Sequence, residues 1–341
     1  MNIIKSVKVA NFRVHKRFEL VTDKMTTLVT GGNGSGKTSL IEALYISLRG
    51  KSFRSADKDI LQKGRQFYRI ETLFCGGERV IVKYTEGKKE FELGGKKHRR
   101  LPKKNRQPIV LFEPSNLNLI HNSPASRRDF FDNLISQIDE PYAEAVHKYK
   151  KSLKQRNNLL KKDLATPENL FAWNVMLARY GTEIVLKRKF FVSEINELLT
   201  KTYQDIAKNH DEVKIVYENT EVDETKYLKL LESSFSKDNV VKNTTFGPHR
   251  DDFLFNFNRQ LANNVASRGE NRTIVLALKF IEAEIIMKYL NKQPIVLLDD
   301  IFSELDESRQ KSLLKNFKTH QIIITSVKPP KGMKSDVNIC N

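Results

Sequence analysis

The sequence predicts an α/β protein whose head is interrupted by an inserted helical arm. A buried-strand pattern at residues 26–30 runs into a glycine-rich loop and then into a helical pattern. Helical spacing dominates from about residue 126 to residue 203, and apolar strand patterns return at 294–298 and 321–325. The chain therefore starts and ends as an α/β domain, with helices between its two parts.

Composition favours a polyanionic partner. Among 341 residues, 59 are Lys or Arg and 41 are Asp or Glu, a formal charge of +18. Nucleic acid is the first candidate for such a surface and an anionic membrane the second, while a merely solubilising excess is the third reading. No apolar run is long enough for a transmembrane helix, and the N-terminus lacks a signal-peptide pattern. Two cysteines are too few for a disulfide framework, so we expect a reduced cytoplasmic protein without a membrane partner.

Strand patterns continue after the first helix. Residues 69–74 and 79–84 both read as strands, and Gly76-Gly77 between them marks a hairpin. A very basic tract follows between Gly87 and Arg106, and its glycines and proline favour a loop or a hairpin tip over a helix. The basic residues of this tract are Lys88, Lys89, Lys96, Lys97, Arg99, Arg100, Lys103, Lys104 and Arg106.

The arm is predicted from two apolar seams on either side of Pro167. Apolar residues recur every three or four positions, or after seven, from Tyr142 to Leu160, and resume from Leu170 to Ile184. Two such helices would form an antiparallel hairpin, each roughly 30 Å long at about 1.5 Å per residue. An ordinary helical core subdomain fits the same spacing. The outer face of the first helix carries Lys148, Lys150, Lys151, Lys154, Arg156, Lys161 and Lys162.

We place the arm at residues 116–244. The head then consists of residues 1–115 together with residues 245–341.

The glycine loop carries a phosphate-binding pattern. Residues 31–38 fit G-x-x-x-x-G-K-S/T, between a predicted strand and a predicted helix. Glycines let backbone N–H groups wrap around phosphates, and the helix presents its N-terminus to the anion. We expect Lys37 to reach the β- and γ-phosphates of ATP and Thr38 to hold Mg²⁺. The predicted nucleotide-binding residues are Gly31, Gly32, Asn33, Gly34, Ser35, Gly36, Lys37, Thr38 and Ser39.

Two acids end the apolar strand pattern at 294–298. Asp299 would lie at the mouth of a parallel sheet, where nucleotides bind, and is the expected second holder of Mg²⁺. Asp300 could orient or deprotonate the attacking water. With Lys37, these acids form the predicted catalytic set. Without the glycine loop, two acids that simply cap a strand would be the better interpretation.

A third element precedes the apolar helical run at 274–283. Ser267 and Gly269 stand just before this run, where N–H groups and a hydroxyl can bind an anion. By itself the pattern is only a weak helix N-cap. Its position shortly before the Asp299 strand follows the motif order of the ATP-binding-cassette (ABC) superfamily, whose signature motif meets the nucleotide of a partner subunit.

Together the motifs resemble those of the RecF family of bacterial recombination mediators, which belongs with the chromosome-maintenance and double-strand-break-repair ATPases of the ABC superfamily. The resemblance runs from end to end of the chain. Its segments are Asn11-Phe12-Arg13, Gly50 to Arg54, Pro114 to Asp132, Gly247-Pro248-His249-Arg250-Asp251-Asp252 and Leu297 to Arg309.

The resemblance implies an ABC-type P-loop ATPase head, ATP and Mg²⁺ as ligands, and an ATP-dependent homodimer. In that dimer, Ser267 and Gly269 would contact the partner's nucleotide and residues 303–306 would lie at the interface. It also implies a weak DNA-dependent ATPase that binds double-stranded DNA near single-strand junctions. By the same resemblance, the protein would work with RecO and RecR to load RecA at the bacterial nucleoid.

The chain departs from the family pattern at several positions. Glu270 and Asn271 replace glutamines, Asn122 replaces a Gly, Asp129 replaces a basic residue, and Thr325-Ser326 stand where cassette transporters have a His. The missing His and the short Asp300 side chain both agree with slow turnover.

Three rival functions fit less well. In a transporter's nucleotide-binding subunit the signature follows the glycine loop much sooner, whereas Gly36 and Ser267 lie about 230 positions apart here. A structural chromosome-maintenance protein needs far longer coiled coils. A DNA-binding module with an inactive loop is disfavoured by the intact Lys37, Thr38 and Asp299. His249 and Arg54 stay ambiguous between packing and a role at the nucleotide.

Overall fold

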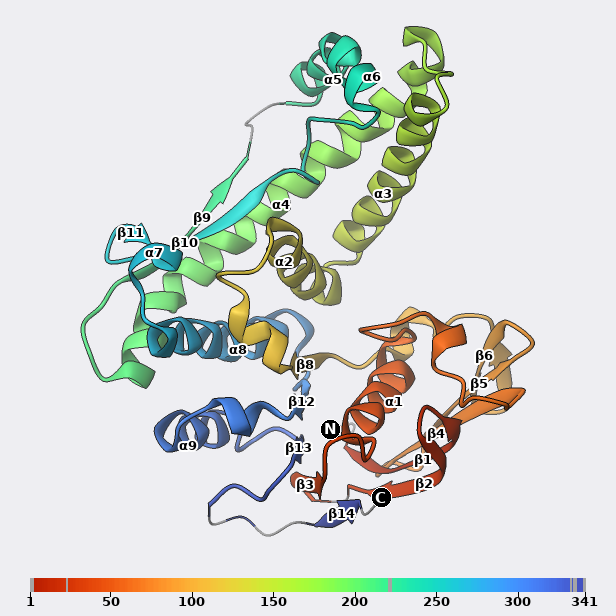
Figure 1. The fold of residues 1–341 in the computed structure, drawn as a ribbon, viewed down its shortest axis with the longest axis vertical. Coiled ribbons are helices and arrows are strands. Elements are labelled where there is room, and N and C mark those ends of the chain that lie inside the picture. Colours follow the sequence, from red (N-terminus) through yellow and green to blue (C-terminus); the bar gives the residue numbers. More distant parts are fainter. Residues whose placement is uncertain (1–2, 23, 220–222, 332, 334–335, 340–341) are drawn as a thin grey trace. The chain divides into compact units, whose positions relative to one another are not determined.

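The protein folds into two compact units (Figure 1). In the computed structural model, unit 1 comprises residues 1–116 and 282–341, and unit 2 comprises residues 117–281. The structure describes residues 3–22, 24–219, 223–331, 333 and 336–339.

The unit boundary differs from the predicted domain boundary. Residues 245–281 were expected with the head, but they pack in unit 2. The reason is strand pairing, because Asp252–Phe257 pairs antiparallel with Val213–Glu218. The aromatic ring of Phe253 also stacks on Phe131, with 3.9 Å between ring centroids.

Unit 1 contains an antiparallel and a parallel sheet. The antiparallel sheet has the strand order β2-β1-β4-β5-β6-β7, and the parallel sheet has the order β14-β3-β13-β12-β8. The antiparallel strands are β1 (Ile4–Phe12), β2 (His15–Val21), β4 (Phe67–Phe74), β5 (Arg79–Thr85), β6 (Lys88–Leu93) and β7 (Lys96–His98). The parallel strands are β3 (Thr26–Gly31), β8 (Ile109–Phe112), β12 (Ile295–Asp299), β13 (Ile322–Ser326) and β14 (Val337–Ile339).

Helix α1 (Lys37–Arg49) is the centre of unit 1. It contacts strands of both sheets, and most of its side chains are buried. Leu40, Ile41 and Leu44 join one apolar cluster with residues of both sheets, such as Val7 and Leu297. Burial of this helix fixes the loop that precedes it. Unit 1 is completed by α9 (Glu307–Asn316) and the short 3₁₀ helices η1 (Asp57–Asp59), η2 (Lys103–Asn105) and η4 (Ile301–Glu304), with η3 (Pro114–Asn118) at the unit boundary.

The predicted strands of unit 1 are confirmed. β3, β12 and β13 cover the three buried-strand patterns, and β4 and β5 form the predicted hairpin. Most of the basic tract is also a hairpin, because β6 and β7 turn at Gly94-Gly95.

Unit 2 is built around two long antiparallel helices. α3 (Glu140–Lys161) and α4 (Pro167–Ala207) lie side by side (Figure 1). Thr166 caps α4, and its side chain accepts a hydrogen bond from the Asn169 N–H. The other elements are α2 (Pro124–Ile138), β9 (Val213–Glu218), α5 (Glu224–Ser233), α6 (Phe235–Val241), β10 (Asp252–Phe257), β11 (Gln260–Leu261), α7 (Ala262–Val265) and α8 (Arg268–Leu290), which continues into unit 1.

The second arm helix is longer than predicted. α4 has 41 residues and is therefore about 60 Å long, not roughly 30 Å. The apolar seam continues past Ile184 through Phe191, Ile195 and Leu199, all of them buried. In the described parts of the chain, no helix is both long and apolar enough to cross a membrane.

Candidate functional site

The parallel sheet of unit 1 brings the glycine loop and the two acids to one edge. β13 lies between β3 and β12, and all three strands run in the same direction. Gly31 ends β3, Asp299 ends β12, and Thr325 lies on β13 opposite Asp299. Carboxyl ends of parallel strands meet at the same edge, which is where ligands bind in open α/β sheets.

Glycines give the loop a backbone that other residues rarely adopt. Gly34 and Gly36 have φ angles of 80° and 98°. A Cβ atom on Gly36 would stand 2.3 Å from Nε2 of His15, so the position has no room for a side chain. The His15 ring also hydrogen-bonds to the Gly36 carbonyl at 3.0 Å. β2 therefore supports the loop at the start of α1.

Lys37 lies against the loop that it follows. Its Nζ donates hydrogen bonds to the carbonyl oxygens of Gly31 and Gly32, at 2.7 and 2.8 Å. The residue is only 6% exposed. A buried ammonium held at a glycine loop can neutralise phosphate oxygens there.

Thr38 and Asp299 are in direct contact. The Thr38 hydroxyl donates to Oδ1 of Asp299 at 3.0 Å, and the Thr325 hydroxyl donates to the same oxygen at 2.8 Å. Hydroxyl and carboxylate oxygens suit Mg²⁺, which takes few protein ligands and completes its shell with phosphates and water. Among the residues that the structure describes, no group of three or more His, Cys, Asp or Glu could hold a metal alone. The donor set thus fits a nucleotide-borne Mg²⁺.

Asp300 is held in an unusual backbone conformation. Its φ angle is 50°, and its N–H donates to the carbonyl oxygen and the hydroxyl of Thr325, at 3.0 and 3.1 Å. Burial raises the pKa of Asp300, with Lys37 opposing and Asp299 adding to the rise. Within the described chain its buried Oδ1 has no hydrogen-bond partner. Asp300 therefore places this acceptor oxygen beside the glycine loop.

A cavity of about 530 Å³ lies beside the loop. Its walls come from the glycine loop and α1, the β1–β2 turn, the segment around Arg54, and Asp300. The lining residues are Arg13, Val14, Asn33, Gly34, Gly36, Lys37, Thr38, Ser39, Arg54, Asp59, Leu61 and Asp300. The predicted loop residues are thus next to Asp300, and two arginines share the same cavity.

Both arginines are anchored by Glu42 of α1, which is fully buried. Arg13 donates to both of its carboxylate oxygens at 2.9 and 2.8 Å, and Arg54 donates to Oε2 at 3.1 Å. The hydroxyls of Ser52 and Ser55 donate to Oε1 as well. Although burial opposes ionisation, the Arg13 and Ser52 hydrogen bonds and the arginine charges keep the pKa of Glu42 below its usual value.

Sequence reasoning did not find this carboxylate. Arg13 and Arg54 belong to matched segments, but Glu42 lies inside an ordinary helical pattern, and its charge on a buried helix was the available signal. Arg54 both packs on Glu42 and lines the cavity.

The predicted signature residues belong to unit 2. Ser267 precedes α8, and its hydroxyl accepts a hydrogen bond from the Glu270 N–H at 3.3 Å. Glu270 returns the bond, since its carboxylate accepts from the Ser267 N–H at 2.6 Å. This reciprocal pair is a capping box. Within one chain, Ser267 and Gly269 lie in a different unit from the glycine loop.

His249 is part of a buried network in unit 2. Its Nδ1 hydrogen-bonds to the Tyr149 hydroxyl at 2.7 Å, and its Nε2 bonds to the Thr244 carbonyl at 3.1 Å. The carbonyl requires a proton on Nε2, so Tyr149 donates to Nδ1. Burial lowers the pKa of His249 to about 4. The structural reading of His249 fits these contacts.

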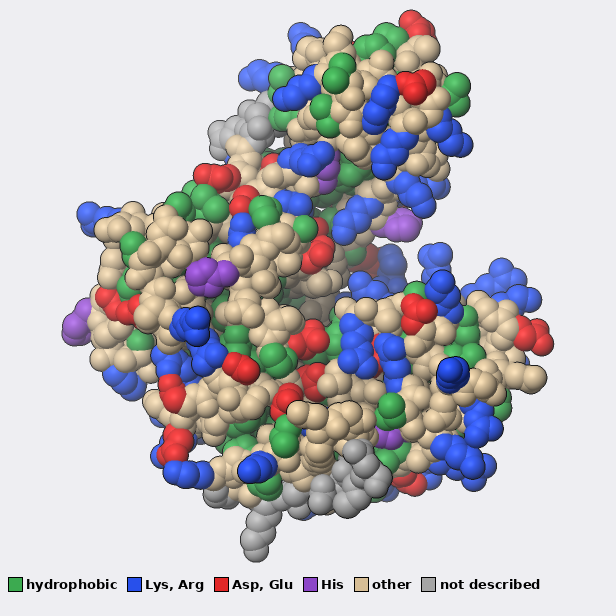
Figure 2. Space-filling model, in the orientation of Figure 1, with side chains coloured by type: hydrophobic (Ala, Val, Ile, Leu, Met, Phe, Trp, Pro, Cys, Tyr) green, Lys and Arg blue, Asp and Glu red, His purple; other side chains and the backbone are tan. Residues whose placement is uncertain are grey.

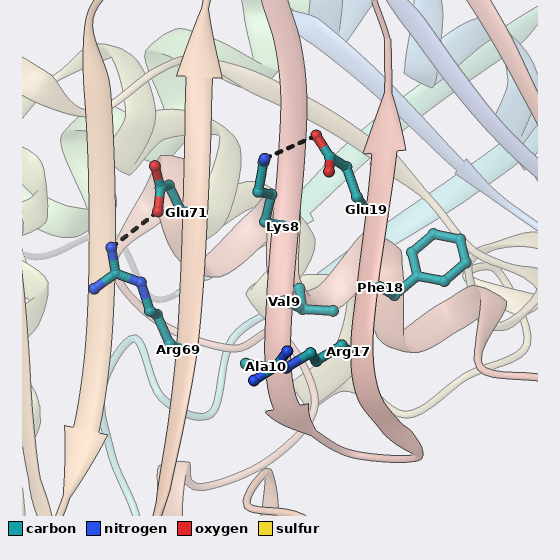
Figure 3. A pocket seen from close by; sticks show the side chains of 8 residues that line it. All are labelled: Lys8, Val9, Ala10, Arg17, Phe18, Glu19, Arg69 and Glu71. Carbon is teal, nitrogen blue, oxygen red and sulfur yellow. Dashed lines mark hydrogen bonds and ion pairs between the residues drawn. The ribbon is translucent and has the colours of Figure 1, made fainter.

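A second hollow, of about 440 Å³, lies on the solvent face of the antiparallel sheet (Figure 3). Arg17 and Arg69 are the cross-strand neighbours of Ala10. Ion pairs Lys8–Glu19 at 3.2 Å and Arg69–Glu71 at 2.9 Å lie along the hollow. Both acids of this hollow are therefore engaged in ion pairs.

Known proteins resemble the chain over nearly its whole length. The AAA ATPase domain family matches residues 1–326. The DNA replication and repair protein RecF of Agathobacter rectalis is 34% identical, over 95% of this chain and 91% of that protein. RecF of Clostridioides difficile is 33% identical, again over 95% and 91%.

Solved structures also resemble the chain over nearly its whole length. A structure described as the recombination mediator protein RecF with ATP in the RecFOR pathway has a TM-score of 0.87 at 28% identity, covering 99% of this chain and 95% of that one. An Smc head bound to the C-winged helix domain of ScpA shares the fold, with a TM-score of 0.53 at 17% identity over 96% of this chain and 90% of that one.

Proposed function

This chain belongs to the RecF family of DNA replication and repair proteins, and on that premise we propose that it binds ATP with Mg²⁺ at the glycine loop and hydrolyses it slowly as a DNA-bound dimer. The observation that carries the ATPase proposal is the contact of Thr38 with Asp299 at the mouth of the loop, beside Asp300. These are the positions that a magnesium nucleotide requires.

Each residue has a distinct role in the proposed reaction. The loop N–H groups and Lys37 hold the β- and γ-phosphates, while Thr38 and Asp299 would hold Mg²⁺. The metal would neutralise charge on the phosphate oxygens. Asp300 accepts a proton from water as the water oxygen bonds to the γ-phosphorus and the bond to the bridging oxygen breaks, leaving ADP and phosphate.

Turnover should be slow for reasons visible at the site. Position 325 is a threonine whose hydroxyl is bound to Asp299, so β13 offers no imidazole to the γ-phosphate. Asp300 has a shorter side chain than glutamate. Without the imidazole, the charge on the γ-phosphate is less stabilised, and the shorter acid sits farther from the water.

Dimerisation would complete the nucleotide site. We propose that Ser267 and Gly269 of one copy contact the nucleotide held by the glycine loop of the other. Support comes from the placement of these residues in a different unit from the loop, at the start of a 23-residue helix.

The nucleic-acid part of the proposal rests on charge and family. A formal charge of +18 suits contacts with phosphate backbones. By family membership, the substrate would be double-stranded DNA near gaps and single-strand junctions, with RecO and RecR as partners in loading RecA at the nucleoid. The RecF–ATP structure is described within the RecFOR pathway, which supports these partners.

Size measurement tests this function directly. Multi-angle light scattering should give a monomer alone and a dimer with ATP and Mg²⁺, and duplex DNA should favour the dimer. The Asp300→Asn variant should hold the dimer longer because ATP persists. A monomer under all of these conditions would contradict the dimer proposal.

A further inference from the structure

One side of helix α3 presents a row of exposed lysines, seen as blue side chains where Figure 1 draws this helix (Figure 2). At about 100° per residue, positions 147, 150, 151, 154, 158 and 161 fall on the same side. We call Lys150, Lys151, Lys154 and Lys161 the lysine face.

The lysine face has no ion-pair partner among the described residues, and the acid that shares a pocket with it, Asp129, makes no ion pair with Lys150. Residues 145–162 include no Asp or Glu. The four lysines make no hydrogen bond or ion pair with any residue that the structure describes. The nearest acid along the chain after the helix, Asp163, is already paired with Lys242. In the same stretch, Arg156 is fully buried and bound to Asp238 at 2.7 Å, so it takes no part in the exposed charge.

The solvent face of the antiparallel sheet differs in this respect. Many of its basic side chains form ion pairs with acids on the same strand or on a neighbouring strand. These pairs are Lys8–Glu19, Arg69–Glu71, Arg79–Glu71, Lys83–Glu92 and Lys97–Glu90. In the basic tract, Lys89 is likewise bound to Asp57 at 2.7 Å. Ion pairs therefore compensate much of the positive charge on the sheet, whereas the lysine face makes none with the residues that the structure describes.

We propose that the lysine face binds the phosphate backbone of double-stranded DNA. The proposal rests on the proposed DNA-binding function and assigns its contact surface. From Lys150 to Lys161 the helix rises about 16 Å, at about 1.5 Å per residue. Phosphates of one strand follow each other about every 3.4 Å along the duplex axis and wind around it, so a helix of this length can contact a few neighbouring phosphates at once.

The helix is a firm support for such contacts. Its opposite side is buried in unit 2 through Tyr142, Tyr149 and Leu160. This burial also argues against a membrane surface, because a membrane-bound amphipathic helix inserts its apolar face into the lipid. In α3 the large apolar side chains of that face already pack in the protein core.

A matched pair of variants tests the assignment. The lysine-face variant replaces Lys150, Lys151, Lys154 and Lys161 by Ala. The control variant replaces four other exposed lysines of unit 2 by Ala, and so removes the same charge. These control positions are Lys201, Lys226, Lys229 and Lys237. Duplex binding with ATP is followed by fluorescence anisotropy at several salt concentrations, and circular dichroism checks that each variant folds.

We expect the lysine-face variant to bind duplex DNA at least about tenfold more weakly at moderate salt. Its salt slope should flatten by roughly 0.9 for each phosphate that the variant no longer neutralises. The control variant should match the parent. A third variant, with Lys96, Lys97, Arg99 and Arg100 replaced by Ala, tests the basic tract.

Three results would overturn the assignment. They are a lysine-face variant with the parent's slope, an equal loss of affinity in the control variant, and a loss of affinity confined to the tract variant. Binding through the lysine face to phosphatidylserine vesicles but not to duplex DNA would also overturn it. Failure of the parent itself to bind duplex DNA would contradict the proposed function, whereas the other results contradict only the place of contact.

Discussion

Replacing Glu42 by Gln should destabilise unit 1 strongly. The carboxylate is fully buried and accepts hydrogen bonds from Arg13, Arg54, Ser52 and Ser55. Gln keeps the shape but offers one acceptor oxygen and turns its NH₂ group toward a guanidinium. Two arginines would then share one neutral partner.

The magnitude follows from the burial of the three groups. Breaking a buried ion pair by removing one partner costs about 3–5 kcal/mol. Side-chain exposures of 21% for Arg13 and 36% for Arg54 let water compensate part of that cost. We therefore expect the lower end, about 3 kcal/mol, which is roughly a 100-fold change in an opening equilibrium.

Amide hydrogen exchange is the appropriate assay, because it reads the opening of α1 and β1 separately from unit 2. Glu71→Gln is the matched control. Glu71 pairs with Arg69 and Arg79, whose side chains are 33% and 63% exposed, so its replacement should cost less than about 1 kcal/mol. If both variants exchange the α1 amides within about threefold of the parent, the Glu42 anchor does not carry the stability assigned to it.

Three further outcomes are expected. Lys37→Ala should weaken triphosphate binding by roughly 30-fold or more, since the variant lacks a charge-assisted hydrogen bond worth about 2–3 kcal/mol. Calorimetry measures this affinity, and an unchanged affinity would contradict the role of Lys37 in phosphate binding. Asp300→Asn should bind ATP and lose hydrolysis. An Asp300→Asn variant that hydrolyses ATP normally would refute the assignment of Asp300 as the base. Because burial raises the pKa of Asp300 above its ordinary 3.8, the parent's hydrolysis rate should fall on acidification at a higher pH than a free aspartate would give. His249 has a pKa of about 4 when folded and 6.5 as its ordinary value, so the unfolded chain takes the proton first. Stability is complete above pH 6.5 and decreases as the pH falls toward 4, by about 2 kcal/mol between about pH 7 and 5. Urea unfolding followed through Trp173 should show this decrease in the parent and not in His249→Gln.

Local patterns predicted much of unit 1. The strand–glycine loop–helix order at β3 and α1 is a short-range signal, because it needs only glycines and a helix start. The acids after β12 were also placed correctly at a strand end. Thr325 lies between the loop and Asp299 because β13 pairs with both β3 and β12. No local sequence pattern encodes this pairing.

Long-range packing explains what sequence reasoning missed. The anchor at Glu42 gathers residues of α1, the β1–β2 turn and the segment after α1. The boundary of unit 2 differs from the predicted domain boundary because β10 pairs with β9, two strands on either side of a helical stretch. The length of α4 was underestimated because its apolar seam was followed only to Ile184.

A nucleotide site shared between two copies of the chain can be tested by mixing two inactive variants. Lys37→Ala removes the loop lysine, and Ser267→Arg blocks the signature. Each variant alone should hydrolyse almost no ATP. A mixed dimer pairs the intact loop of the Ser267→Arg chain with the intact signature of the Lys37→Ala chain.

We expect ATPase activity to return on mixing, together with ATP-dependent dimerisation of the mixture measured by light scattering. Dimerisation is measured together with ATPase activity because strict coupling of the two sites could make a dimer with one intact site inactive. If Ser267→Arg alone dimerises and hydrolyses ATP like the parent, the shared site is contradicted, and the nucleotide site must be complete within one chain.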